Sequence, residues 1–350
     1  MPKQIDTAEI AKKYTPVFET RFDACVIAMS YSFDNRLLCS SPVDGDTLIH
    51  EAQTGKKISA LPGAAAGTFW NNTNPVRNLL AIGYDNKKAA IYSLDDFSKV
   101  QDLDHAGAWV EHGAWSACGE YLATSAAKKV YIWKSDGTLI FTSPEHGGTI
   151  AGLDWNHGKP ELAVASYGGI SLWDISDLAS MTPLSYKGSL LTIRWSPSGK
   201  WIASGNQDSS LHIWPIKQKV EDLHMSGYAV KIQSIAWNPQ SRYLASANLN
   251  NVTIWDFKGT GPSGSTPEMF ETVAGQIATM AYHPKEPLLL AVGTSAGHIE
   301  LYSQSIKNFV AIRALDDDPL QSMAWSPDGK QIAAGGERGS LRVWNVNLTK

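Results

Sequence analysis

A pattern of about forty residues recurs along most of this sequence. The last copy, WSPDGKQIAAGGERGSLRVW, spans residues 325–344, and close relatives of it begin at Trp195 and Trp237. In each copy two aromatic residues lie 18 to 22 residues apart, with a polar turn, a run of small residues and a second turn between them. A period of this length indicates an array of structural repeats.

The two aromatic positions give the number of repeats. The first position is occupied by Tyr31, Trp70, Trp115, Trp155, Trp195, Trp237, Tyr282 and Trp325. The second is occupied by Tyr92, Trp133, Trp173, Trp214, Trp255, Tyr302 and Trp344, with His50 as a degenerate first member. Successive second positions are 42, 41, 40, 41, 41, 47 and 42 residues apart. The sequence therefore predicts eight repeats, with seven as the alternative if the degenerate first copy is not a repeat.

Each copy has the composition of consecutive antiparallel strands. SIAW, YLASA and VTIW, within residues 234–255, are short runs separated by the turn sequences NPQSR and NLNN. A fourth, weaker strand follows the second aromatic position, as at 137–143 and 307–313. Four short strands in forty residues are typical of a propeller blade. We therefore expect an all-β chain that forms a single closed propeller of four-stranded blades.

The repeats resemble the WD-repeat family of β-propellers. WSPDGK, YLASA and the Trp-Asp pairs at 173–174 and 255–256 carry the resemblance, which extends from about residue 24 to the C-terminus. The family has a structural network of a His before the first strand, a Ser or Thr in the second, an Asp in the next turn and the Trp of the third. No copy here has all four. Asp208 and Trp214 supply two members in one copy, and His146 and Trp173 supply two in another.

The resemblance also implies how the ring closes. Only six residues follow Trp344, too few for an outer strand, and in this family an N-terminal segment usually completes the last blade. We expect that strand within YTPVFETRF at 14–22, and the propeller domain to span 14–350. The extension at 1–13 has Asp6 as a possible N-cap with Glu9 three residues later, which is compatible with a short helix.

Composition limits the possible functions. The formal net charge is -4 and the pI is near 6.1, which provides no basic surface for nucleic acid. Cys25, Cys39 and Cys118 are widely spaced and fit neither a disulfide framework nor a metal site. The charged N-terminus and the lack of a long apolar run predict neither a secretory signal nor a membrane span. We expect a cytoplasmic protein that binds neither nucleic acid nor membranes.

Motifs for chemistry are lacking. There is no phosphate-binding loop, no nucleophile elbow and no zinc-binding motif. His105 and His112, near three carboxylates, form the most metal-like cluster, but His105 lies close to where the family places its structural histidine. We therefore expect no catalytic residue, no cofactor and no metal. The alternatives are a propeller that binds a small ligand or a metal in its channel, and, less favoured, a propeller enzyme.

The loop surface remains as the candidate site. In the family topology, the turns after the second strand of each blade share a face with the connections between blades, and acidic residues outnumber basic ones on this face. It also carries Trp109, which lies outside the repeat positions and is either a docking residue or packed under its own loop. The predicted partner site consists of Trp109, Asp44, Asp85, Gln207, Asp208, Asn248, Asp316, Asp317 and Glu337.

These residues predict a protein-interaction scaffold or adaptor. Its partners would be one or more proteins with basic or mixed-charge segments, since an acidic rim attracts such segments. Two features remain outside this site. Trp201 is expected to pack between blades. The Gly/Pro/Ser-rich insertion at 257–270 is expected to be a flexible loop on the opposite face, with a partner-binding arm as the less favoured alternative.

Overall fold

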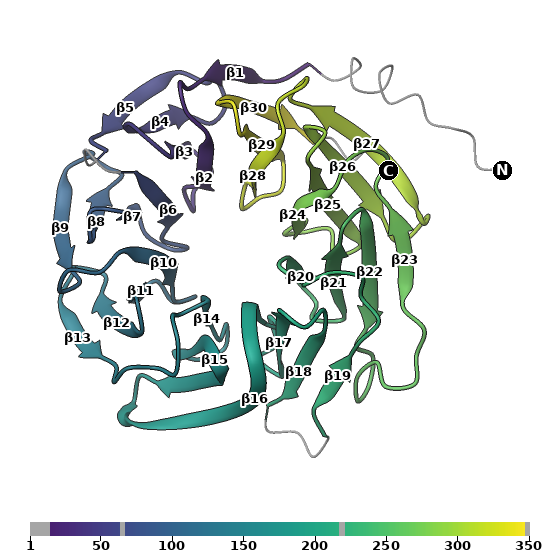
Figure 1. Cartoon of the computed structure of the whole chain (residues 1–350). Coiled ribbons are helices and arrows are strands. Elements are labelled where there is room, and N and C mark those ends of the chain that lie inside the picture. The colour runs from purple at the N-terminus through teal and green to yellow at the C-terminus, as the bar shows by residue number, and fades with distance from the viewer. Residues whose placement is uncertain (1–14, 64–66, 217–220, 347–350) are drawn as a thin grey trace.

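The computed structural model describes residues 15–63, 67–216 and 221–346, which form a ring around a central channel (Figure 1). Every regular element in these ranges is a strand, so the described chain is all-β. No helix long and apolar enough to cross a bilayer occurs in them. The short helix considered for 1–13 lies outside the described residues.

Five blades consist of four consecutive antiparallel strands, which we call a to d from the channel outwards. Blade 1 contains β2 (Val26–Tyr31), β3 (Leu37–Pro42), β4 (Thr47–Glu51) and β5 (Lys57–Leu61). Blade 2 contains β6 (Thr68–Thr73), β7 (Leu79–Tyr84), β8 (Lys88–Ser93) and β9 (Lys99–Asp104). Blade 3 contains β10 (Val110–Trp115), β11 (Tyr121–Ala126), β12 (Lys129–Lys134) and β13 (Leu139–Thr142). Blade 6 contains β20 (Ile235–Trp237), β21 (Tyr243–Asn248), β22 (Asn251–Asp256) and β23 (Glu268–Glu271). Blade 7 contains β24 (Ile277–Tyr282), β25 (Leu289–Thr294), β26 (His298–Ser303) and β27 (Asn308–Ala314). The outer strands expected at 137–143 and 307–313 are confirmed.

One sheet of six strands contains two repeats, blades 4 and 5. Its strands are β14 (Gly152–Trp155), β15 (Glu161–Asp174), β16 (Asp177–Trp195), β17 (Trp201–Asn206), β18 (Leu211–Pro215) and β19 (Leu223–Met225). β15 is a hairpin, because the N–H of Ile175 donates to the Pro160 carbonyl at 3.0 Å across its two ends. Fourteen extended residues would instead span roughly 46 Å. β16 is the outer strand of blade 4 along 177–189 and the inner strand of blade 5 along 190–195.

Eight inner strands surround the channel in the described part of the chain. Neighbouring inner strands contact one another in a closed cycle that runs through β2, β6, β10, β14, β16, β20, β24 and β28 (Figure 1). Counted as continuous hydrogen-bonded sheets, the described residues form seven. The eight sequence repeats thus correspond to eight inner strands. The alternative number of seven corresponds to the sheets, because the six-stranded sheet contains two repeats.

The N-terminal strand completes blade 8, as expected. This blade contains β28 (Leu320–Trp325), β29 (Gln331–Gly336) and β30 (Ser340–Asn345), and β1 (Phe18–Arg21) pairs antiparallel with β30. The ring of Phe18 also lies against Gly55 of blade 1, where a Cβ would come within 2.3 Å of it. The first strand therefore joins the two ends of the chain and the two blades beside the seam.

Tryptophan at the end of an inner strand connects neighbouring blades. The indole N–H groups of Trp115, Trp155 and Trp237 donate to main-chain carbonyls of the preceding blade at 3.1, 2.9 and 3.3 Å. Such a residue buries a large apolar area and also satisfies one backbone acceptor. This double role accounts for tryptophan in these three blades, whereas the indole nitrogen of Trp195 at the same position is buried without a partner.

The first aromatic position of the second repeat was wrongly assigned to Trp70. The residue in blade 2 whose register matches Tyr31 of blade 1 is Thr73, which lies 42 residues from the aromatic positions on either side. The Trp70 indole instead donates to a carbonyl of blade 3 at 2.9 Å. It fits there because Gly83 and Gly113 leave room: a Cβ on either would approach the ring to about 2 Å (2.1 and 2.0 Å).

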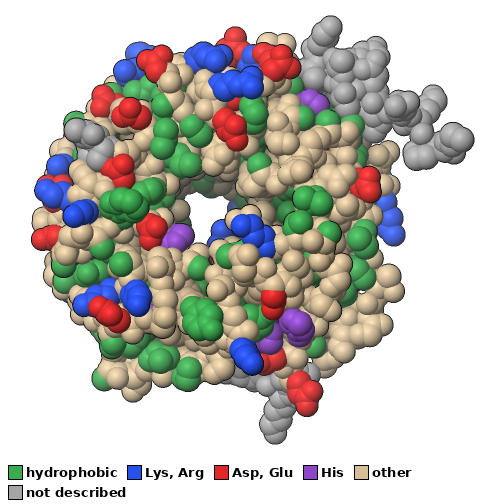
Figure 2. All heavy atoms as spheres, in the orientation of Figure 1, with side chains coloured by type: hydrophobic (Ala, Val, Ile, Leu, Met, Phe, Trp, Pro, Cys, Tyr) green, Lys and Arg blue, Asp and Glu red, His purple; other side chains and the backbone are tan. Residues whose placement is uncertain are grey.

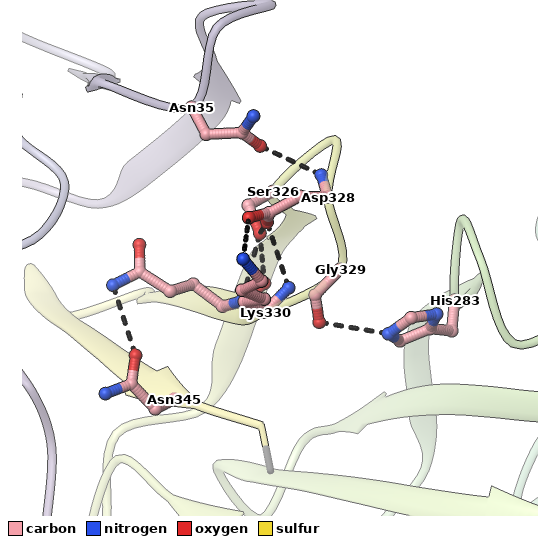
Figure 3. Close-up of polar contacts among 8 residues, drawn as sticks. Asn35, His283, Ser326, Asp328, Gly329, Lys330 and Asn345 are labelled. Atoms are coloured by element: carbon pink, nitrogen blue, oxygen red, sulfur yellow. Dashed lines mark hydrogen bonds and ion pairs between the residues drawn. The ribbon is translucent and has the colours of Figure 1, made fainter. Parts of the chain in front are cut away.

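Turns between strands a and b join neighbouring blades (Figure 3). The ring nitrogen Nε2 of His283 in blade 7 contacts the Gly329 carbonyl of blade 8 at 2.9 Å. The N–H of Asp328 in the same turn donates to the Asn35 side chain of blade 1 at 2.8 Å. The Ser326 hydroxyl accepts the N–H of Gln331, the first residue of β29, at 2.9 Å. These turns thus form a belt that links successive blades.

The insertion at 257–270 is packed along its first half. Phe257 and the buried Trp201 have ring centroids 5.3 Å apart, and a Cβ on Gly261 would lie 3.2 Å from Trp201. Pro262 is buried as well, whereas 263–266 are exposed. The packing of Trp201 between blades is confirmed, and the expectation of a flexible loop is corrected for this half.

Candidate protein-binding face

The histidines considered as metal ligands have structural partners. His105 is buried, which lowers its pKa to about 4, and its Nε2 contacts the Thr124 hydroxyl at 2.7 Å. The indole N–H of Trp133 donates to the same hydroxyl at 2.8 Å. His112 contacts a backbone carbonyl through Nε2 at 3.2 Å. The described residues contain no group of three or more His, Cys, Asp or Glu that could hold a metal.

The nine predicted site residues share one end of the blades. Because successive strands are antiparallel, the b–c turns lie at the same end as the d–a connections between blades. We call this end the loop face. The b–c turns contain Asp44, Asp85, Gln207, Asp208 and Glu337, and strand a of blade 3 is directly preceded by Trp109. Strand b of blade 6 ends at Asn248, and the connection between blades 7 and 8 contains Asp316 and Asp317.

An apolar patch lies on the loop face of blades 1 to 3. Trp109 is 57% exposed and is therefore not packed under its own loop. Its ring lies 6.2 Å from that of Phe69, which is also exposed, with an interplanar angle of 50°. Exposed Val43 is next to this pair, because its carbonyl accepts the N–H of Thr68 at 3.1 Å. We call Val43, Phe69 and Trp109 the apolar patch.

Two predicted carboxylates border the apolar patch. Asp44 follows Val43 in the b–c turn of blade 1 and is exposed. The N–H of Asp85 donates to the Gly67 carbonyl at 2.9 Å, which places Asp85 beside the strand of Phe69. Neither carboxylate forms an ion pair with a described residue. Neither charge is thus neutralised internally, although one oxygen of the half-buried Asp85 carboxylate is buried.

The border continues across the seam into blade 8. The Cys25 carbonyl accepts the N–H of Val43 at 2.7 Å. Burial raises the pKa of the Cys25 thiol, as do the nearby charges of Glu337 and Asp318. Glu337 and Asp317 are exposed, and their side chains are without an ion pair in the described ranges. A chain of neighbouring residues thus runs from Trp109 through Phe69 and Val43 to Cys25, with Asp44, Asp85 and Glu337 beside it; Asp317 is exposed nearby in blade 8.

The other four predicted residues do not join this group. Asn248 is only 8% exposed, and its side-chain amide binds two backbone groups of the loop at 229–230. Asp208 accepts hydrogen bonds from Tyr186 and Ser210, both at 2.6 Å, in blade 5. Its neighbour Gln207 is exposed, but blade 5 lies across the channel from blade 1 (Figure 1).

Asp316 lies near the seam but is already paired. Its carboxylate binds the guanidinium of Arg342, which also binds Glu19 of the N-terminal strand. The side-chain hydrogen bond to Arg342 lowers the pKa of Asp316. Asp316 therefore supports ring closure.

Phe69 and Val43 were missed in the sequence. Neighbouring residues of a strand point to opposite faces, so one of Phe69 and Trp70 had to face away from the packed side. That signal was available in the sequence. Figure 2 shows one face of the ring, with an open channel and hydrophobic side chains in separate patches among interspersed charges of both signs. Local arrangement therefore matters more than overall charge.

Comparisons with known families match three stretches of the chain. The model for the WD domain, G-beta repeat, matches residues 182–215 and 221–256. The model for the anaphase-promoting complex subunit 4 WD40 domain matches residues 280–350. The first two stretches cover the outer strand of blade 4 through strand c of blade 6, and the third covers blades 7 and 8.

Several curated proteins are similar at low identity. Serine-threonine kinase receptor-associated protein of Homo sapiens is 23% identical over 272 residues, 66% of this chain and 77% of that protein. Autophagy-related protein 16 of Arabidopsis thaliana is 21% identical over 64% of this chain and 44% of its own length. Transcriptional corepressor LEUNIG_HOMOLOG of the same plant is 22% identical over 76% and 33%. The chain thus spans less than half the length of the last two.

Solved structures share the fold at still lower identity. A chain in the crystal structure of the mitotic checkpoint complex has a TM-score of 0.65 and 15% identity, with 95% of this chain and 92% of that chain covered. The computationally designed Ika8 protein has a TM-score of 0.76 and 13% identity, with 93% and 98% covered. These two likenesses show the shared fold, and it is the match to the WD-repeat model that fits a protein-interaction scaffold. Because two family models match its repeats and its blades close into a ring, the chain is a WD-repeat β-propeller protein.

Proposed function

We propose that the protein is a non-catalytic scaffold that docks a partner protein on the loop face of blades 8, 1, 2 and 3. The observation that carries this proposal is the exposed pair of Phe69 and Trp109 beside Val43. Exposed apolar groups that are contiguous and rimmed by polar residues mark interaction sites, and tryptophan is the residue most enriched among their energetic anchors. The names of a receptor-associated relative and a checkpoint-complex neighbour agree with such a role.

The partner segment is expected to combine an apolar residue with lysine or arginine. The apolar residue would cover Trp109 and Phe69, and the basic residues would face Asp44, Asp85 and Glu337. Charges at the rim of an interface mainly set the association rate and its salt dependence, whereas a buried anchor sets the dissociation rate. The two contributions can therefore be measured separately.

We also propose that the scaffold acts in the cytoplasm without a cofactor. Free cysteines suit a reducing compartment, and Cys25, Cys39 and Cys118 form no disulfide among the described residues. The charge balance favours protein partners over nucleic acid or membranes. Fractionation of the native cell and a search for nucleic acid in purified complexes would check these two points.

Affinity purification from the native cell, followed by titration with the purified partner, tests the docking face. Trp109→Ala should weaken binding about 30-fold or more, equivalent to ~2 kcal/mol for an interface anchor. Leu139→Ala, which removes an exposed apolar residue from the outer strand of blade 3, is the matched control and should leave the affinity unchanged.

Charge reversals test the border. Asp44→Lys and Glu337→Lys should slow association severalfold at low salt and lose this effect at high salt. Glu120→Lys, an exposed acid in an a–b turn at the other end of blade 3, is the control. The proposal is wrong if the partner binds Trp109→Ala as tightly as the wild-type protein.

A further inference from the structure

A groove with a volume of about 700 Å³ lies between blades 6 and 7. One wall comes from strands β22 and β23 with the end of the insertion, and the other comes from β26 and the turn that follows it. Its lining includes Tyr243, Asp256, Glu268, Phe270, Tyr302 and Gln304. The groove lies away from the b–c turns and thus belongs to a different surface from the apolar patch.

The insertion helps to build the groove. The repeat period here is 47 residues, and the added residues place Thr266 and Pro267 at one wall. On the opposite wall, Tyr302 replaces the tryptophan found at this position in most blades. Its hydroxyl donates to Glu268 at 2.7 Å, from blade 7 to blade 6. This contact fixes the carboxylate of Glu268 at the groove.

Aromatic rings from the two walls meet in the groove. Phe270 and Tyr302 are stacked, with centroids 3.8 Å apart and an interplanar angle of 17°. The second carboxylate oxygen of Glu268 has no hydrogen-bond partner among the described residues. A carboxylate beside aromatic faces is the environment that suits a guanidinium group, which pairs with carboxylates and stacks on rings.

The rim of the groove already shows this mode of binding within the chain. Arg242 forms two hydrogen bonds with Asp256, at 3.2 and 2.9 Å, while its guanidinium carbon lies 5.0 Å from the centre of the Tyr243 ring. Asp256 is therefore neutralised, and Glu268 remains. Exposed Lys307 lies at the end of the groove and would repel a cationic ligand. Removing its charge therefore provides a test.

Gln304 supplies a hydrogen-bond donor to the groove. It is only 8% exposed, and its Oε1 accepts the Tyr282 hydroxyl at 3.1 Å. Its amide NH₂ group donates to no other described residue, although it lines the groove. Solvent therefore reaches this amide nitrogen from the groove, and the carbonyl of a bound peptide could take the place of water as its acceptor.

The geometry points to a second docking site, and we propose that it takes an arginine side chain of a partner polypeptide. The guanidinium would pair with Glu268 and stack on Phe270, while the adjacent peptide carbonyl would accept from Gln304. Apolar neighbours of that arginine would rest on Met269 and Ile306, which flank the groove from the two blades and are 61% and 63% exposed. The site requires no residue of the loop face, so each proposal can fail without the other.

Methyl NMR of the full chain tests this site. With ¹³C-methyl methionine, the Met269 signal is assigned from its loss in Met269→Leu. Acetyl-Leu-Arg-Leu-amide should shift that signal saturably, and the same peptide with citrulline in place of arginine should bind at least tenfold more weakly. Citrulline keeps the size and polarity of arginine and removes its charge, so the pair isolates the electrostatic contribution.

Two variants with opposite expected effects complete the test. Glu268→Gln keeps an acceptor for the Tyr302 hydroxyl and should weaken the arginine peptide at least tenfold. Lys307→Met should tighten binding two- to fivefold, since it removes an opposing charge, and Glu120→Gln is a distant control. Equal binding of the citrulline peptide, or weaker binding by Lys307→Met, would overturn the proposal even if Glu268→Gln failed to fold.

Discussion

Replacing Val164 by threonine should stabilise the protein, because it would restore in blade 4 a hydrogen-bond chain that blade 3 contains. In blade 3 the Trp133 indole donates to the Thr124 hydroxyl, and this hydroxyl donates to Nε2 of His105. His105 is neutral at pH 7, since burial lowers its pKa to about 4. Its Nδ1–H donates to a backbone carbonyl at 3.0 Å, which leaves Nε2 as an acceptor.

Blade 4 has the same arrangement without the hydroxyl. Val164 and Trp173 lie forty residues after Thr124 and Trp133. His146 contacts a backbone carbonyl through Nδ1 at 3.0 Å, but its Nε2 and the Trp173 Nε1 are buried without partners. The two rings are 6.5 Å apart, compared with 5.4 Å in blade 3. A hydroxyl at position 164 would accept from one and donate to the other.

The expected gain follows from two hydrogen bonds. Valine and threonine are close in shape, and each new bond contributes ~0.5–1.5 kcal/mol, so Val164→Thr should gain about 1–3 kcal/mol. With an unfolding entropy of about 2.1 cal/mol/K per residue over 350 residues, the Tm should rise by about 1–4 °C. The mirror variant Thr124→Val leaves two buried groups without partners and should lose about 2–4 kcal/mol.

Urea unfolding at pH 7, followed by tryptophan fluorescence, and calorimetry for Tm would measure both variants. Equal m-values are required for the comparison, since a changed slope indicates a changed unfolded state. If Thr124→Val is destabilising and Val164→Thr is neutral or destabilising, the wider ring separation of blade 4 prevents the bridge. The reasoning from blade 3 to blade 4 would then be refuted.

Three further changes test other parts of the ring. Burial raises the pKa of Glu300 to about 7, so the folded protein holds this proton more tightly than the unfolded chain, and the free energy of unfolding should fall by about 3 kcal/mol as the pH rises from 4.5 to 8. Glu300→Gln should abolish this decline in urea titrations, and a decline that persists would contradict the assignment. Phe18→Ala should cost about 2 kcal/mol by calorimetry, because it removes the contact of β1 with Gly55; no loss of Tm would show that closure does not depend on it. Gly329→Ala should cost at least ~2 kcal/mol, since φ is +77° and a Cβ would lie 2.2 Å from the His283 ring, and an unchanged urea midpoint would exclude this strain.

Much of the fold was predictable because each blade packs only against its neighbours. Periodic aromatic residues therefore indicate the number of inner strands, and the resemblance to the WD-repeat family implied the N-terminal strand that pairs with β30. The prediction was wrong where chemistry departed from the period. Thr73 occupies an aromatic position, and only its spacing of 42 residues from both neighbours reveals it.

The site was less predictable, because a polar residue in a turn can bind its own backbone or face solvent. Asp44 and Asn248 occupy comparable b–c turns, yet the first is exposed and the second is buried and bound to a neighbouring loop. The choice depends on whether unpaired backbone groups lie within reach, which is a property of three-dimensional packing. Residue type alone does not determine it.

The apolar patch lies beside the seam where the chain closes its ring. Val43 hydrogen-bonds to Cys25, only four residues after the N-terminal strand, and Phe22 donates its N–H to Gly339 of blade 8 at 2.8 Å. Loss of the N-terminal strand should therefore disturb Val43 and Glu337 together. The segment that follows the strand binds Val43 through Cys25, and it binds Gly339, two residues after Glu337, through Phe22. The groove between blades 6 and 7 is built from strands outside the seam and does not share this dependence. Ring closure should consequently be coupled to the geometry of the proposed loop-face site, whereas the groove depends on the insertion of blade 6, which supplies Thr266 and Pro267.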